Sequence, residues 1–99
     1  MTKEKIERSE AILRKKRNTR KGLQKRNQIL IFLNSNTNYF FTTSEIMDGT
    51  GTNYASVVYH LRNMHDEDIV EKTTINRRVK WKITGLGQQT IKRWLENNS

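Results

Sequence analysis

The chain has 99 residues, a formal net charge of +9 and no cysteine. This length suits one compact domain, and the missing cysteines exclude disulfides, thiolate metal sites and cysteine nucleophiles. A positive surplus of this size favours a polyanionic partner, nucleic acid before an anionic membrane.

Most of the positive charge lies in the first 26 residues. They carry eleven Lys or Arg and three Glu, a net charge of +8, whereas residues 27–99 carry a net charge of +1. Residues 2–17 contain good helix formers but few apolar side chains, which predicts a marginal helix or a solvated arm. We therefore expect a basic N-terminal arm or helix at 1–21, followed by one folded domain at 22–99.

The next elements follow from periodicity and composition. Apolar side chains recur with helical spacing after Gly22, which predicts a first helix over 22–34. A polar stop follows at 34–38. Tyr39-Phe40-Phe41 then indicates a short strand, and we expect these three aromatic side chains to lie in the core together with Trp81.

A second, short helix is expected over 43–48. Thr42 and Glu45 have the spacing of a capping box, in which each side chain bonds the backbone N–H of the other. Gly49-Thr50-Gly51 then predicts a turn, because glycine adopts positive φ without strain.

A third helix is expected to start at Thr52 or Asn53 as N-cap and to run to about His65. Its predicted buried stripe has helical spacing and comprises Tyr54, Val57, Leu61 and Met64. The opposite side then carries polar groups, with Val58 and His60 on the flanks.

Two strands and a last helix complete the pattern. Residues 69–75 and 79–83 indicate strands joined at an Asn76-Arg77 tip, and the second strand alternates apolar with basic side chains. Residues 86–97 are expected to form the last helix. The predicted order is α-β-α-α-β-β-α, mainly α with a small β-hairpin.

Two short helices joined by a glycine-containing turn expose the outer side of the second helix, which can enter the major groove of DNA. The chain also resembles the winged helix-turn-helix transcriptional regulators, with ArsR-like and MarR-like repressors of prokaryotes, archaea or viruses the nearest types. The stretches that carry this resemblance are Thr43-Ser44-Glu45-Ile46, Ser56-Val57-Val58-Tyr59-His60-Leu61-Arg62-Asn63-Met64, Ile69-Val70-Glu71 and Trp81-Lys82-Ile83-Thr84.

The resemblance implies a winged helix-turn-helix fold over about 23–97 and a DNA-binding function. It implies that Ser56, Tyr59 and His60 match base-contacting positions, and that Arg77 and Arg78 match wing positions that contact phosphate or the minor groove. Asp68 departs from the pattern, because such families often have Gly there; Asp tolerates the left-handed conformation, so the turn is expected to persist. Cysteine pairs of metal-sensing relatives are absent.

The candidate DNA-binding residues fall into three groups. The recognition helix offers Thr52, Asn53, Ser56, Tyr59, His60, Arg62 and Asn63; the hairpin offers Arg77, Arg78 and Lys80; and the arm offers Arg14, Lys15, Lys16, Arg17, Arg20 and Lys21. The expected function is sequence-specific binding of double-stranded DNA by a transcriptional regulator, as a repressor.

Other interpretations remain open. The outer helix face, the hairpin cations and the arm can each be a solvated surface without a partner. A nonspecific architectural DNA- or RNA-binding protein has the same charge, and a winged helix can instead dock on another protein. The acidic run His65-Asp66-Glu67-Asp68 is interpreted as a solvated helix end, since four consecutive side chains diverge, and no metal is expected.

The expected partners are DNA and a second copy of the chain. One small winged domain binds DNA weakly, so we expect a homodimer with an interface formed by Ile6, Leu13, Ile91, Trp94 and Leu95. No signal-like or membrane-spanning apolar stretch is present, which predicts a cytoplasmic, nucleoid-associated protein. We expect no enzymatic activity, no cofactor and no small-molecule effector.

Overall fold

The predicted succession of elements is confirmed over residues 20–97, the part of the chain that the computed structural model describes. The helices and strands are α2 (Arg20–Asn34), β1 (Phe41–Thr42), α3 (Thr43–Thr50), α4 (Tyr54–Asp66), β2 (Val70–Ile75), β3 (Arg78–Ile83) and α5 (Gly85–Asn97). The observed order is α-β-α-α-β-β-α, as expected for a winged helix.

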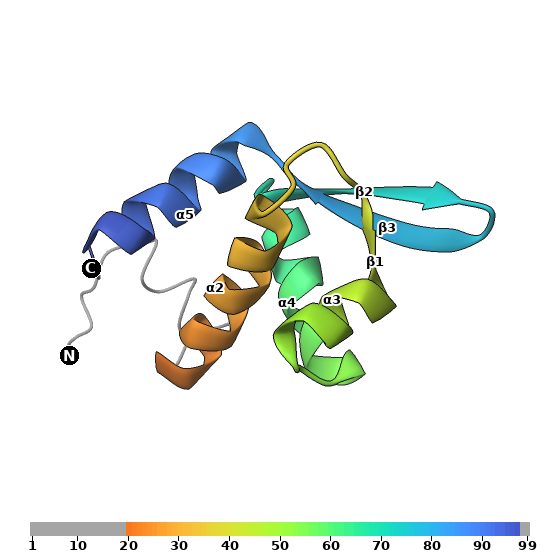
Figure 1. Cartoon of the computed structure of the whole chain (residues 1–99), viewed down its shortest axis with the longest axis horizontal. Coiled ribbons are helices and arrows are strands. Elements are labelled where there is room, and N and C mark those ends of the chain that lie inside the picture. The colour runs from red at the N-terminus through yellow and green to blue at the C-terminus, as the bar shows by residue number, and fades with distance from the viewer. Residues whose placement is uncertain (1–19, 98–99) are drawn as a thin grey trace.

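A small antiparallel sheet connects the helices, with the strand order β1-β3-β2. Phe41 pairs with Trp81 and Val70 pairs with Ile83. Strand β1 lies at 41–42 rather than at the expected 39–41, because its register is set by pairing with β3 and not by its own aromatic run. The hairpin formed by β2 and β3 extends beyond the helices on one side of the molecule, and α5 lies on the other side (Figure 1).

The hairpin turns at the predicted Asn76-Arg77 tip. Both residues have positive φ, 52° and 68°, as a two-residue type I′ turn requires. Asp68 also has positive φ, 62°, which confirms the expected left-handed turn between α4 and β2. This hairpin is the wing, residues 70–83.

The core lies between the three helices α2, α3 and α4, the sheet and α5. Its fully buried apolar side chains come from all of these elements and include Leu30, Ile46, Leu61, Ile83 and Ile91. Helix α5 approaches the start of β2 very closely at Gly87, where an added Cβ would overlap the carbonyl oxygen of Ile69. Glycine is therefore required for this contact.

Two side chains expected in the core, Tyr39 and Tyr54, are exposed instead, and so is Val79 on the wing. Tyr39 is 42% exposed, since its hydroxyl donates to Glu45 at the surface. Tyr54, the first residue of α4, is 61% exposed. Val79 has the alternation of a buried residue, but it lies in the part of the wing beyond the core and is 39% exposed.

Candidate nucleic-acid interface

The entry into α3 is fixed by the predicted capping box. The backbone N–H of Glu45 donates to the Thr42 hydroxyl at 3.1 Å, and the Thr42 N–H donates to the Glu45 carboxylate at 2.8 Å. This N–H lowers the pKa of Glu45 more than any other group, against the opposing effect of burial. Both orphan donors at the helix start are thereby satisfied.

The connection between α3 and α4 is shorter than predicted. Helix α3 continues through Gly49 to Thr50, and Gly51 alone takes the left-handed conformation, with φ 67° and its N–H bonded to the Met47 carbonyl at 2.8 Å. Asn53 then caps α4, accepting from the Ser56 N–H at 2.9 Å. These bonds fix the angle at which α4 leaves α3.

Helix α4 has one buried and one exposed side. The buried side consists of Val57, His60, Leu61 and Met64. Tyr59 is 45% exposed, Arg62 and Ala55 are exposed, and Ser56 and Asn63 are half-buried. The predicted outward position of Tyr59 and Arg62 is therefore found, and both stand on the side of α4 opposite the core.

Two residues of the predicted recognition set do not face outward. His60 is only 8% exposed and Thr52 only 5% exposed. Burial lowers the pKa of His60, and the nearby positive charges of Arg26 and Lys25 lower it further, so His60 faces α2. The helical period placed His60 at the edge of the buried stripe, and this position alone could not predict whether its side chain is buried or exposed.

Asn53 is exposed, but the cap restricts what it can contact. Its carboxamide oxygen already accepts the Ser56 N–H. The amide nitrogen keeps its donors, since a carboxamide carries both functions. Asn53 can therefore offer an outside partner a donor, but its oxygen is largely committed to the helix.

The wing adds cations at and behind its tip. Arg77 and Arg78 are exposed, whereas Lys80 is half-buried and its charge contributes to lowering the pKa of Glu45. The exposed Lys72, whose ammonium lies 5.7 Å from the Trp81 ring centre, was not among the predicted residues. Knowledge of the strand register, which pairs Lys72 with Trp81, would have identified Lys72 as a cation of the wing.

The arm and part of the expected dimer surface lie outside the described residues. This applies to Ile6, Leu13, Arg14, Lys15, Lys16 and Arg17, while Arg20 and Lys21 form the first turn of α2. Ile91 is fully buried in the core of its own chain. Contrary to the prediction, it is therefore not available for contact with a second copy. Leu95 is 42% exposed and Trp94 is half-buried.

Two further findings concern residues 20–97. None of the helices there is long and apolar enough to cross a membrane. Within the same range, no three His, Cys, Asp or Glu side chains are grouped so that they could hold a metal ion.

Comparison with known proteins identifies the fold. MepR from S. aureus, in a variant bound to an oligodeoxyribonucleotide, matches with a TM-score of 0.67 and 16% identity over 73% of this chain and 54% of that chain. BpsR from Bordetella bronchiseptica matches with a TM-score of 0.65 and 13% identity, over 70% of this chain and 50% of that one. MarR from E. coli matches with a TM-score of 0.62 and 15% identity, over 69% and 51%.

These three proteins are winged-helix transcriptional regulators of the MarR family. No protein-family model and no curated protein sequence matches the chain. The chain spans about half the length of the solved structures that it matches. The likeness establishes that this protein is a winged helix, the fold that the sequence predicted.

Proposed function

We propose that this protein is a sequence-specific regulator that binds double-stranded DNA and represses transcription. The observation that carries the proposal is the outward side of α4, where Tyr59 and Arg62 are exposed on a helix that follows a capped helix-turn-helix connection. The major groove of B-form DNA, about 12 Å wide, admits one α-helix.

The chemistry of this helix face suits base contacts. An arginine such as Arg62 can donate two parallel hydrogen bonds to a guanine edge, and each such pair discriminates by about 1–3 kcal/mol. Ser56 and Asn63 add smaller polar groups beside it. MepR, which has a similar fold, has been solved with an oligodeoxyribonucleotide, and this supports DNA as the ligand here.

The wing and the arm supply contacts that do not depend on sequence. Arg77 and Arg78 are exposed at the end of the wing, where they can reach phosphates or the minor groove. The basic arm lies within residues 1–26, which carry a net charge of +8, and it attracts the DNA backbone through release of counterions.

We also propose that the chain binds DNA as a homodimer. Leu95 and Trp94 on α5 offer apolar surface to a second copy, and Ile6 and Leu13 of the arm are proposed to join it. Two copies of α4 would then meet half-sites whose centres lie about 10 bp apart, or a multiple of this.

Replacement of Arg62 by Ala tests base contact. Binding to a site selected from random duplexes should weaken by about 1–3 kcal/mol more than binding to random duplex. The matched control is Lys92→Ala, which removes an exposed cation from α5 and should leave the ratio of the two affinities unchanged.

Competition binding with labelled selected DNA separates the possibilities. Equal losses on selected and random duplex would assign Arg62 to the backbone and favour an architectural protein. Preferential competition by single-stranded RNA would indicate an RNA-binding protein. Absence of duplex binding at low salt would indicate a winged helix that docks on another protein, as the near-neutral domain permits.

A further inference from the structure

The outward side of α4 is mainly apolar and aromatic. Its central positions recur at helical spacing and form an outer row of Tyr54, Ala55, Val58, Tyr59 and Arg62. Tyr54 is 61% exposed and Tyr59 is 45% exposed, while Ala55 is exposed and Val58 is half-buried. Only Arg62 brings a charge to this row, and the other positions present largely apolar surface.

The polar side chains that the sequence offered for base contact are less available. Thr52 and His60 are buried, at 5% and 8% exposure. The Asn53 carboxamide oxygen accepts the Ser56 N–H as a helix cap, and Ser56 itself is half-buried. The outer row therefore meets a partner with more apolar surface than hydrogen-bonding groups.

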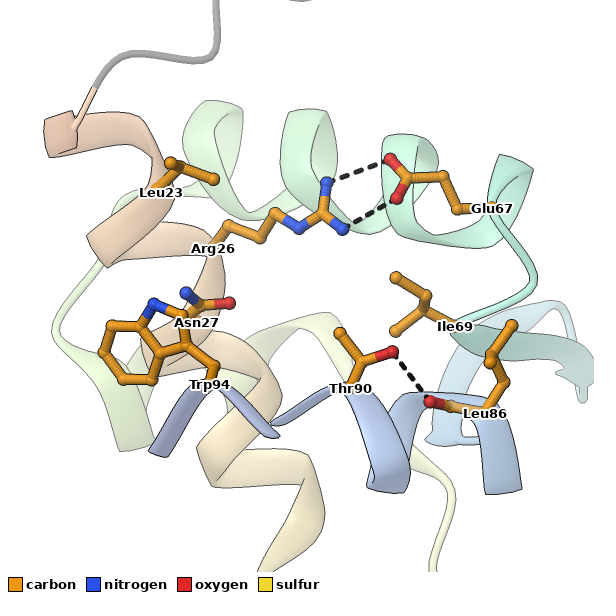
Figure 2. A pocket seen from close by; sticks show the side chains of 8 residues that line it. All are labelled: Leu23, Arg26, Asn27, Glu67, Ile69, Leu86, Thr90 and Trp94. Atoms are coloured by element: carbon orange, nitrogen blue, oxygen red, sulfur yellow. Dashed lines mark hydrogen bonds and ion pairs between the residues drawn. The ribbon is translucent and has the colours of Figure 1, made fainter. Parts of the chain in front are cut away.

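Contacts on the opposite side of α4 fix the direction of the outer row. Leu61 is fully buried, and the C-cap residue Glu67 accepts two hydrogen bonds from Arg26 of α2, at 2.9 and 2.7 Å (Figure 2). The Tyr59 ring meets the His60 ring edge-on, with centroids 5.2 Å apart. Rotation of α4 about its axis would expose Leu61, so the apolar row is the surface that a partner meets.

The charges near the outer row favour DNA over a protein as the partner. Residues 54–62 contain no Asp or Glu, and a carboxylate enters the row only at Asp66, the last residue of α4. Arg77 and Arg78 are exposed on the wing, and residues 1–26 carry a net charge of +8. The major groove of DNA combines flanking phosphates with an apolar group, the 5-methyl group of thymine.

We propose that the outer row of α4 recognises thymine methyl groups, so that the preferred DNA site has thymines at fixed positions. This inference rests on the DNA binding proposed above. The first turn of a recognition helix contacts base edges, so Tyr54 and Ala55 meet one thymine. Tyr59 follows Ala55 by about 6 Å along the helix axis. This distance is close to two base-pair steps of about 3.4 Å, and Tyr59 meets a second thymine.

Replacement of thymine by deoxyuridine tests the proposal, because uracil pairs as thymine does and lacks only the 5-methyl group. A preferred site is selected from random duplexes with the full chain, and each thymine in it is then replaced in turn. At each contacted thymine the Kd should rise about fourfold, as expected for one buried methyl group. Replacement of thymines in the same duplex but outside the selected site is the control and should leave the Kd unchanged.

Variants of the tyrosines assign the methyl contacts to α4. Tyr54→Ala and Tyr59→Ala should each lose the difference in Kd between thymine and uracil at one position and keep it at the other. Tyr59→Phe retains the ring and should keep both differences. Ile31→Ala is the matched control, since it removes an exposed apolar side chain from α2, and it should also keep both. Each variant is compared with itself on two duplexes, so a general loss of affinity does not alter the result.

Three results would overturn the proposal. If a preferred site is found but deoxyuridine leaves the Kd unchanged at every position, DNA binding stands and the methyl contacts are wrong. If both Tyr→Ala variants keep every difference, the methyl groups act through the shape of the DNA and not through α4. If no duplex is preferred over random duplex, or none binds at low salt, the proposed sequence-specific function fails together with this inference.

Discussion

Arg77 takes a left-handed backbone conformation, φ 68°, at the tip of the wing, where glycine would be unstrained. A non-glycine residue in such a conformation costs about 1–3 kcal/mol, and such strain is concentrated at functional sites. The exposed guanidinium at this position is therefore consistent with a contact to DNA that the wing could not make with glycine.

Replacement of Arg77 by Gly should separate stability from binding. The free energy of unfolding is expected to stay the same or to rise by up to about 1 kcal/mol, since relief of strain is partly offset by the freer unfolded chain. DNA affinity should fall, and the slope of log K against log salt should become shallower by about one.

Arg77→Ala is the matched control for this experiment. It removes the same charge but keeps the strained conformation. Arg77→Ala should therefore bind DNA as weakly as Arg77→Gly does, but its free energy of unfolding should be lower than that of Arg77→Gly. Urea denaturation and binding at several salt concentrations measure both quantities. Unchanged DNA affinity in both variants would contradict a role for the wing tip.

His60 should make the fold sensitive to mild acid. Burial, followed by the charges of Arg26 and Lys25, lowers its pKa below the ordinary value of 6.5. Below that value the unfolded chain binds a proton that the folded chain resists. Stability that is present above about pH 6.5 is therefore lost as the pH falls towards the folded pKa.

His60→Gln should flatten this dependence. Between pH 7.5 and 5, the unfolding free energy of the unchanged chain should fall more steeply than that of the variant, by no more than about 1.4 kcal/mol per pH unit for one proton. Glu45, whose pKa is lowered from 4.5, loses its contribution only at lower pH. Parallel pH profiles of the two proteins would show that His60 protonates equally in both states.

At the scale of single elements, the cap of α3 is the clearest local determinant of structure. The hydroxyl of Thr42, the N-cap residue, accepts from the N–H of Glu45 in the first turn of a helix of only eight residues. Thr42→Ala should lower the free energy of unfolding by about 1 kcal/mol. Thr42→Ser keeps the hydroxyl and should retain most of the stability; equal losses in urea denaturation would mean that the methyl group matters instead.

Local signals explain which elements were predictable from the sequence. The Thr42–Glu45 box and the Asn53 cap depend on residues three apart, so their outcome was visible in the chain itself. The position of β1 depends on its pairing with a strand about 40 residues away, and it was displaced from the aromatic run. Helix α3 likewise continued through Gly49, where side-chain propensity alone predicted a turn.

The candidate site was predictable in outline but not in its boundaries. Periodicity placed Tyr59 and Arg62 outward, but it could not tell that the first turn of α4 would leave Tyr54 exposed or that α2 would cover His60. The contact of Arg26 with Glu67 could not be predicted at all, because the two residues lie 41 positions apart and meet only in the folded chain.

At the scale of the whole molecule, charge and fold are divided between two parts of the chain. Residues 1–26, which include the arm at 1–21, carry a net charge of +8, and residues 27–99 carry only +1. The salt-dependent part of the DNA affinity scales with the number of phosphates that the protein neutralises. If α4 contacts bases and supplies specificity, most of this part of the affinity must come from cations outside α4. Within the proposed function, the arm and the helix should therefore be separable by mutation.

Replacement of Arg14, Lys15, Lys16 and Arg17 by Gln in the full chain tests this division. Each lost phosphate contact makes the slope of log K against log salt shallower by about 0.9, so four contacts would change it by about three to four. The ratio of affinities for selected and random duplex should persist, because α4 is unchanged. Lys92→Gln with Arg93→Gln is the control on the exposed side of α5 and should leave the slope unaltered. A loss of the affinity ratio with an unchanged slope would instead place the arm at the bases and the backbone contacts on the folded domain.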